Sequence, residues 1–110
     1  MPADRPLPAA LLELVAYRFR VIGEPMRIRL LEQLRHGPAT VGQLADTLGA
    51  SQQNVSKHLG TLHHAGILSR EKQGTSVRYA IADTSVFELC ELVCGRLRQQ
   101  LTELDQILNT

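Results

Sequence analysis

The sequence predicts a mainly α-helical fold with one small β-hairpin, built as a single domain. Apolar residues recur every three or four positions through most of the chain, which is the spacing of one face of an α-helix. In residues 67–82 the spacing changes to every second position, which is typical of a half-buried strand. A chain of 110 residues has room for one modest core, so residues 1–110 are expected to form one domain.

The N-terminal segment is expected to be a flexible arm followed by a helix. Residues 1–8 contain three of the five prolines, and a helix is predicted over about residues 9–21. Apolar side chains fall on two sides of this helix, so either a partner subunit or the rest of the same domain must cover them. One side carries Leu11, Leu14, Val15, Phe19 and Ile22, and the other carries Leu12 and Tyr17.

A second helix is predicted between a break at residues 23–24 and a stop signal at residues 37–38. Pro25 suits the first position of this helix, where its missing N–H would have no partner. Arg27 and Arg29 either reach phosphates or lie on a solvated face. The side chains expected to face the core are Ile28, Leu31 and Leu34.

Residues 40–65 are predicted to form two short helices joined by a tight turn. Thr40 is a good N-cap, and Gly49 can adopt the left-handed conformation that ends a helix. Ser51 can then cap a second helix. The predicted inward stripe of the first helix is Val41, Leu44, Ala45 and Leu48, and that of the second is Val55, Leu59 and Leu62.

The start of the second of these helices carries a polar set that points to DNA recognition. Amides can pair bidentately with adenine, hydroxyls can bond bases or phosphates, and a lysine can bond guanine or neutralise a phosphate. These groups lie at the end of the helix that meets base edges in a helix-turn-helix. The alternative is an ordinary helical hairpin with a solvated polar face. The candidate DNA contacts are Ser51, Gln52, Gln53, Asn54, Ser56, Lys57 and His58.

Residues 67–82 are predicted to form a β-hairpin with a polar, net-basic tip. Val77, Tyr79 and Ile81 alternate with Arg78 and Ala80, and residues 71–76 supply the turn. An isolated hairpin is marginal in water, so it must pack on the helices. A basic hairpin directly after a recognition helix is a wing, placed to lie along the DNA backbone or minor groove. The candidate phosphate contacts on this wing are Lys72, Thr75 and Arg78.

The last segment, residues 84–108, is predicted to be one long helix that dimerises. Its main apolar stripe alternates spacings of three and four, which is the pattern of a coiled-coil seam. A second stripe of Val86, Leu89 and Val93 can pack on the domain. A seam left over after the core is covered favours a symmetric homodimer, with the first helix contributing. The seam consists of Phe87, Cys90, Cys94, Leu97, Leu101, Leu104 and Leu108.

The predicted order of helix, helix, helix-turn-helix, basic hairpin and long helix is that of a winged helix-turn-helix dimer. The chain also resembles the ArsR/SmtB (arsenical-resistance repressor) family of bacterial transcription regulators. The matching segments are GEPMRIRLLEQL, TVGQLADTLGASQQNVSKHLGTLHHAGIL and REKQGTSVRYAI, within residues 19–82. The resemblance implies a repressor that sits on a palindromic DNA operator and is released by an effector. Gly60 departs from the family pattern, and because glycine costs roughly 1 kcal/mol relative to alanine in a helix, a softer recognition helix is expected.

The metal sites that the resemblance would imply are incomplete in this sequence. The first helix of the helix-turn-helix has no cysteine near residues 41–44, and no histidine follows Asp83 on the last helix, where Ser85 stands instead. No metal site is therefore assigned. Cys90 and Cys94 share a helix face, so they could bind a thiophilic ion such as arsenite or act in redox sensing. Inert packing in the seam, an unrelated ligand and no effector at all remain open alternatives.

Other function classes find less support in the sequence. There is no nucleotide-binding loop, nucleophile elbow or metal triad, so an enzyme is not expected. A winged helix used for protein contacts is the main alternative, but its docking face would carry apolar or aromatic residues rather than amides, hydroxyls and lysine. The lack of a signal peptide or an apolar membrane span predicts a cytoplasmic protein.

Overall fold

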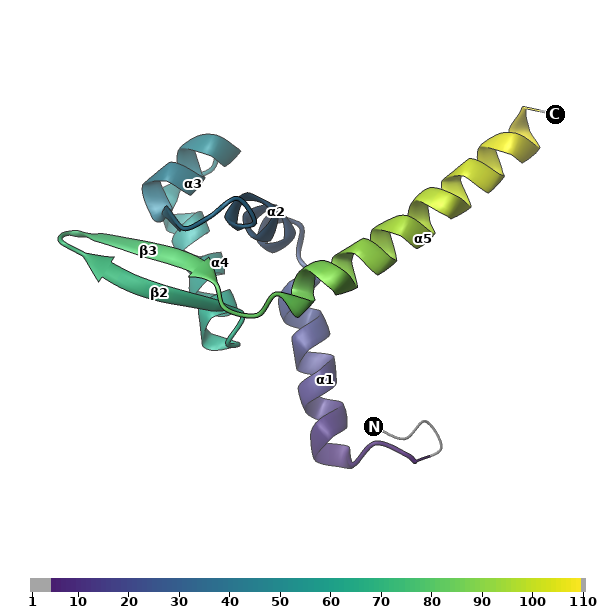
Figure 1. The fold of residues 1–110 in the computed structure, drawn as a ribbon, viewed down its shortest axis with the longest axis horizontal. Coiled ribbons are helices and arrows are strands. Elements are labelled where there is room, and N and C mark those ends of the chain that lie inside the picture. The colour runs from purple at the N-terminus through teal and green to yellow at the C-terminus, as the bar shows by residue number, and fades with distance from the viewer. Residues whose placement is uncertain (1–4, 110) are drawn as a thin grey trace.

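The computed structural model describes residues 5–109, which fold into five helices and a small sheet (Figure 1). The arm predicted over residues 1–8 lies partly outside this range, because residues 1–4 are not described. The elements follow the predicted order, with one added strand. They are α1 (Ala9–Ile22), α2 (Pro25–Leu34), β1 (Ala39–Thr40), α3 (Val41–Leu48), α4 (Gln52–His64), β2 (Leu68–Gln73), β3 (Ser76–Ile81) and α5 (Ser85–Leu108).

The helix-turn-helix of α3 and α4 begins and ends as its capping residues predict. The Thr40 hydroxyl accepts a hydrogen bond from the Gln43 backbone N–H at 3.2 Å, and the Gln43 side chain accepts one from the Thr40 N–H at 2.9 Å. This reciprocal capping box satisfies two N–H groups at the start of α3. Gly49 ends α3 in the left-handed conformation with φ 63°, which favours glycine. The turn to α4 is therefore fixed by local chemistry.

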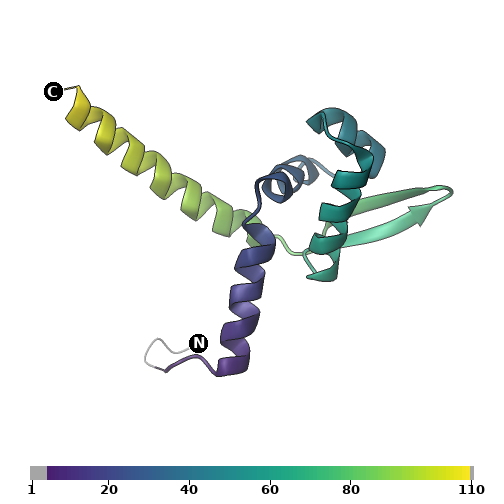
Figure 2. The ribbon, with the colours of Figure 1, turned by 180° about the vertical axis from the view of Figure 1, so that it is seen from behind.

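The sheet has three antiparallel strands rather than the two that the sequence predicted. Its order is β1-β3-β2. Tyr79 of the middle strand β3 pairs with Ala39 of β1 on one side and with Arg70 of β2 on the other. The short β1 gives the inner edge of β3 a partner, so β3 is a central strand. The base of the hairpin packs on α4, and its tip extends away from the helices (Figure 2).

The core lies between α2, α3, α4 and the base of the hairpin. Leu30, Val55, Leu59, Leu62 and Ile67 are completely buried there, and for the three residues of α4 this confirms the predicted inward stripe. Tyr79 is also buried. The prediction for Ile28 is wrong, because its side chain is exposed and Leu30 takes the core position instead.

Helices α1 and α5 diverge from this core and leave apolar side chains uncovered (Figure 1). Phe19 on α1 is 56% exposed, and Leu101 on α5 is 65% exposed. Only the beginning of α5 is anchored, through the buried Val86 and the half-buried Phe87, Leu89 and Cys90. The domain itself therefore leaves the N-terminal part of α1, Phe19 and the predicted seam of α5 beyond Cys90 uncovered.

Candidate nucleic-acid interface

The start of α4 presents a row of exposed polar side chains. Ser51 is the N-cap, and its hydroxyl accepts a hydrogen bond from the Asn54 backbone N–H at 3.1 Å. Val55, Leu59 and Leu62 turn inward and are completely buried, so the opposite side of the helix faces solvent. The exposed residues of this recognition face are Ser51, Gln52, Gln53, Asn54, Ser56 and Lys57.

The sequence prediction that His58 points outward is wrong. His58 has 9% relative exposure, and its Nδ1 lies 3.2 Å from Nη1 of Arg27 on α2. A sequence signal for this existed, since His58 lies three residues after Val55 and four before Leu62, which places it on the buried stripe. His58 therefore packs against α2 beneath the helix and is not part of its exposed face.

Arg27, one of the two arginines considered for phosphate contact, also points inward. Its Nε donates to the Val21 carbonyl and its Nη2 to the Arg20 carbonyl at 3.2 Å, both in the last turn of α1. Arg29 remains exposed and donates weakly to the Leu48 carbonyl at 3.4 Å. The sequence analysis did not predict these bonds of Arg27 to backbone carbonyls. They depend on how α1 and α2 pack together, which no local sequence pattern specifies.

The wing presents Lys72 and Thr75 at its exposed tip. Residues Gln73 and Ser76 are paired, so Gly74 and Thr75 form a two-residue turn. Gly74 has φ 62°, a conformation that favours glycine. This tight turn holds Lys72 and Thr75 away from the body of the domain, where a long or hydroxylated side chain can reach a partner.

Arg78, the third candidate of the wing, lies in a different setting. It sits on the central strand, opposite Thr40 on β1 and Glu71 on β2. Its side chain is half-buried, and among the described residues its Nε is a buried atom without a hydrogen-bond partner. Cross-strand neighbours share a face, so Arg78 lies on the face opposite to Lys72, which pairs with Val77. The three wing candidates therefore do not form one cluster.

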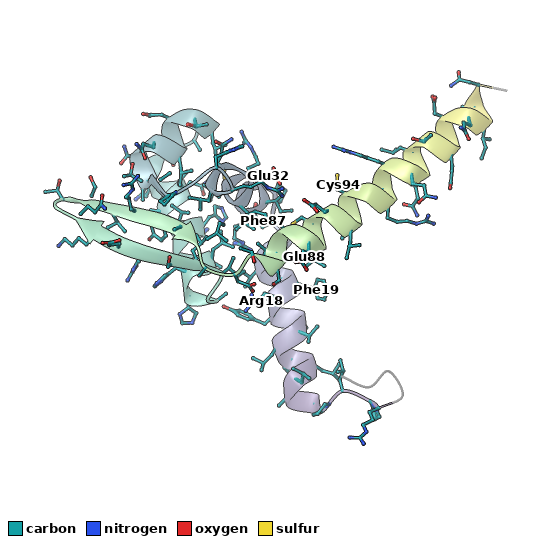
Figure 3. The ribbon with its side chains drawn as sticks, viewed as in Figure 1. Arg18, Phe19, Glu32, Phe87, Glu88 and Cys94 are labelled. Atoms are coloured by element: carbon teal, nitrogen blue, oxygen red, sulfur yellow. The ribbon has the colours of Figure 1, made fainter. Side chains whose placement is uncertain are left out.

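The two cysteines line an open, largely apolar cavity of about 710 Å³ between α1, α2 and α5. Figure 3 shows Phe19, Glu32 and Cys94 around this junction. Cys90 is half-buried, and burial, with a smaller contribution from the Glu32 carboxylate, raises the pKa of its thiol. Cys94 is exposed. Within residues 5–109 no group of three or more His, Cys, Asp or Glu side chains could hold a metal ion.

Comparison with known proteins decides the family. Residues 22–71 match a family model described as a helix-turn-helix domain. The chain is 35% identical over 91 residues to SmtB, an HTH-type transcriptional repressor of Mycobacterium tuberculosis, and the match covers 74% of this chain and 67% of SmtB. The chain belongs to the ArsR/SmtB family. This is a family of transcriptional regulators of the winged helix type and not of enzymes, which confirms the predictions of family and fold.

Solved structures of the ArsR/SmtB type share the fold over nearly the whole chain. The crystal structure of AntR, an antimony-specific transcriptional repressor, is 31% identical to this chain with a TM-score of 0.77, and the match covers 91% of this chain and 92% of AntR. The homodimeric winged helix-turn-helix DNA-binding domain of Mb0332 from Mycobacterium bovis is 28% identical with a TM-score of 0.75, covering 92% and 94%. Other curated relatives are matched over less of their length, 64% for NmtR and 55% for CmtR.

In the part of the chain that the structure describes, no helix has the length and apolar character needed to cross a bilayer.

Proposed function

We propose that this chain is a dimeric repressor that binds a palindromic DNA operator and is released from it by an effector. The observation that carries the proposal is the recognition face at the start of α4, which is exposed and polar and lies in the same domain as a basic wing. A regulator of this kind acts in the cytoplasm of a bacterial cell, where the DNA lies.

On DNA, the N-terminal half of α4 would enter the major groove. Gln52, Gln53 and Asn54 carry amides that can pair with adenine, and Lys57 can bond guanine or a phosphate. The hydroxyls of Ser51 and Ser56 suit phosphate contacts near the helix start. The wing would lie along the backbone through Lys72 and Thr75, with Arg78 contributing charge from the central strand.

Dimerisation is supported by the uncovered apolar surfaces of α1 and α5. Leu97, Leu101 and Leu104 follow one another at seam spacing on α5, and each is at least half exposed in the protomer. A row of exposed leucines on a helix is costly in water unless a partner covers it. The homodimeric Mb0332 domain offers a precedent. Two copies would present their recognition helices to successive major grooves, about 34 to 36 Å apart.

The effector is proposed to be a thiophilic ion such as arsenite, or an oxidant, acting at Cys90 and Cys94. AntR, a relative of similar fold, is an antimony-specific repressor. The two thiols of one protomer do not make a complete ion site, and the raised pKa of Cys90 disfavours the thiolate that a soft ion needs. An ion that takes three or more ligands would therefore require donors from both protomers, and its binding would deprotonate Cys90.

The operator is tested first. Duplexes are selected from a random library with the wild-type protein, and the recovered sequence is expected to be an inverted repeat with half-sites about one helical turn apart. Recovery of no sequence preference would remove the DNA-binding proposal.

The effector is then tested on the selected duplex. Affinity is measured with and without arsenite, mercuric ion, peroxide or persulfide for the wild type and for the Cys90→Ser/Cys94→Ser variant. The wild type should release DNA in response to at least one of these reagents, and the variant should not respond. Equal responses in both proteins would exclude the cysteines from the mechanism.

A further inference from the structure

A partly buried polar cluster joins the recognition helix to the end of α1. The guanidinium of Arg27 donates to the carbonyls of Arg20 and Val21, which belong to the last turn of α1, and its Nη1 lies 3.2 Å from Nδ1 of His58 on α4. The Glu24 carboxylate caps α2 by accepting from the Arg27 N–H at 3.0 Å. One side chain thus connects three helices.

The hydrogen bond at His58 is directional, whereas most of the buried contacts of α4 are not. Val55, Leu59 and Leu62 pack on the core through apolar atoms, and such contacts have no preferred direction. Two arginines supply directional bonds to the end and middle of α4: Arg27 at His58, and Arg18, whose Nη2 donates to the Ala65 carbonyl at 3.1 Å. The geometry of both bonds depends on how α4 is rotated about its axis.

The chemistry of the partners determines the form of the His58 ring. A guanidinium only donates hydrogen bonds, so Nδ1 of His58 must accept, and the ring proton must reside on Nε2. Oε2 of Glu24 lies 3.7 Å from the same Nδ1, which is beyond hydrogen-bond length. Arg27, and not Glu24, therefore holds the ring.

We propose that His58 is a positioning residue for DNA recognition, which orients the recognition face of α4 and couples it to the end of α1 through Arg27. This inference rests on the proposed function. His58 follows Ser56 and Lys57 directly in the sequence, and a helix rotates by about 100° per residue. A small rotation of α4 released by loss of the bond would therefore move the whole exposed row of amides relative to the wing. Because α1 is proposed to dimerise, the same bond would carry a change in the dimer interface to the DNA surface.

A matched pair of variants separates the hydrogen bond from the volume of the side chain. In His58→Asn the amide oxygen can occupy the position of Nδ1 and accept from Arg27. In His58→Leu a methyl group takes that position, and the Arg27 donor loses its partner. His58→Gln, whose amide reaches the position of Nε2 instead, replaces the leucine variant if that protein does not fold. Thermal unfolding of each variant establishes that the comparison is made on folded protein.

The first measurement is the ratio of affinities for the selected duplex and for a shuffled duplex of the same composition. His58→Leu should lose about tenfold in this ratio, the equivalent of one hydrogen bond from a charged donor, while His58→Asn stays close to the wild type. A purely structural role would lower both affinities together and leave the ratio unchanged. An unchanged ratio in a folded His58→Leu protein would overturn the proposal.

The second measurement does not depend on DNA. Side-chain nitrogen spectra of the wild type should show His58 with an unprotonated Nδ1 and a protonated Nε2. The backbone amide resonances of residues 52–57 should shift in His58→Leu and remain near their wild-type positions in His58→Asn. If the wild type selects no duplex, the proposed function fails, and these resonances alone decide whether His58 orients α4. A protonated Nδ1, or unmoved resonances in His58→Leu, would overturn the inference.

Discussion

The guanidinium of Arg18 on α1 forms an ion pair with Asp83 at the start of α5, with Nη1 3.0 Å from Oδ2. The same side chain donates from Nη2 to the Ala65 carbonyl at the end of α4. Arg18 therefore connects α1 and α5, the two helices with exposed apolar surfaces, to α4, which carries the recognition face. Asp83 also accepts from the Ser85 hydroxyl at 2.6 Å and from the Ser85 N–H at 3.0 Å, so it binds the first backbone N–H of α5.

Asp83 should make the stability of the protein dependent on pH in the acidic range. The Ser85 hydrogen bonds, helped by Arg18, lower the pKa of Asp83 below its usual value. As the pH falls, the unfolded chain is protonated first, so the stabilisation is complete above about pH 4 and is lost as the pH falls through the folded pKa. Asp83→Asn keeps an amide oxygen for the Ser85 bonds but removes the charge that pairs with Arg18. It should therefore cost about 0.2 to 1 kcal/mol at pH 7, and this difference should shrink towards pH 3.

Urea unfolding of the wild type and Asp83→Asn at pH 7, 4.5 and 3 measures this effect. Asp46→Asn is the matched control, because Asp46 is exposed on α3 and its side chain has no hydrogen bond to another described residue. A difference between wild type and Asp83→Asn that stays constant with pH would contradict the assignment.

The recognition face and the wing should differ in how their loss affects DNA binding. Gln53→Ala should reduce discrimination between base pairs at one operator position by about 1 to 3 kcal/mol. Lys72→Ala should weaken binding to all duplexes and reduce the slope of log affinity against log salt by about 1. Fluorescence anisotropy on the selected duplex and its single-base variants, over a range of salt concentrations, measures both. Gln73→Ala, which changes no charge on the same strand, is the control for the wing. If Gln53→Ala lowered the affinity for all duplexes equally, the placement of α4 in the major groove would be wrong.

Local signals predicted most of the fold, and contacts between distant segments account for the errors. Thr40, Ser51 and Gly49 act within a turn of the helices they bound, so the sequence is sufficient to locate them. The strand β1 has two residues and no periodicity, and it exists because Ala39 pairs with Tyr79 far along the chain. No pattern within residues 38–41 could have predicted it.

The same local rules predicted most of the candidate site, and the one error, at His58, again involves a contact with a distant segment. The outward positions at the start of α4 follow from helical spacing, and six of the seven are exposed as expected. His58 was assigned by its chemical type, as a polar residue, although its spacing placed it among Val55 and Leu62. Its burial is possible because Arg27 satisfies the ring nitrogen, and a buried polar group needs such a partner.

The seam on α5 should control the oligomeric state. Leu101→Lys would place a charge at the centre of the proposed helix pair, where its desolvation is unfavourable, and should convert the dimer to a monomer at micromolar concentration. Gln99→Lys introduces the same charge two residues away, on the outer side of the predicted heptad pattern, and should leave the dimer intact. Light scattering after size exclusion measures both. Dimers of equal stability in the two variants would move the interface away from this seam.

The same substitution should have opposite effects at Gly60 and Gly49. At both positions an added Cβ would meet nothing within 4 Å, so space does not decide the outcome. Gly60 lies within α4 in ordinary helical conformation, where alanine is preferred, and Gly60→Ala should stabilise the fold by about 0.5 to 1 kcal/mol. Gly49 has φ 63°, and Gly49→Ala should destabilise it by about 1 to 2 kcal/mol. Chemical denaturation of the two variants measures both changes in stability. A loss of stability in Gly60→Ala would mean that α4 requires glycine at this position and does not merely tolerate it.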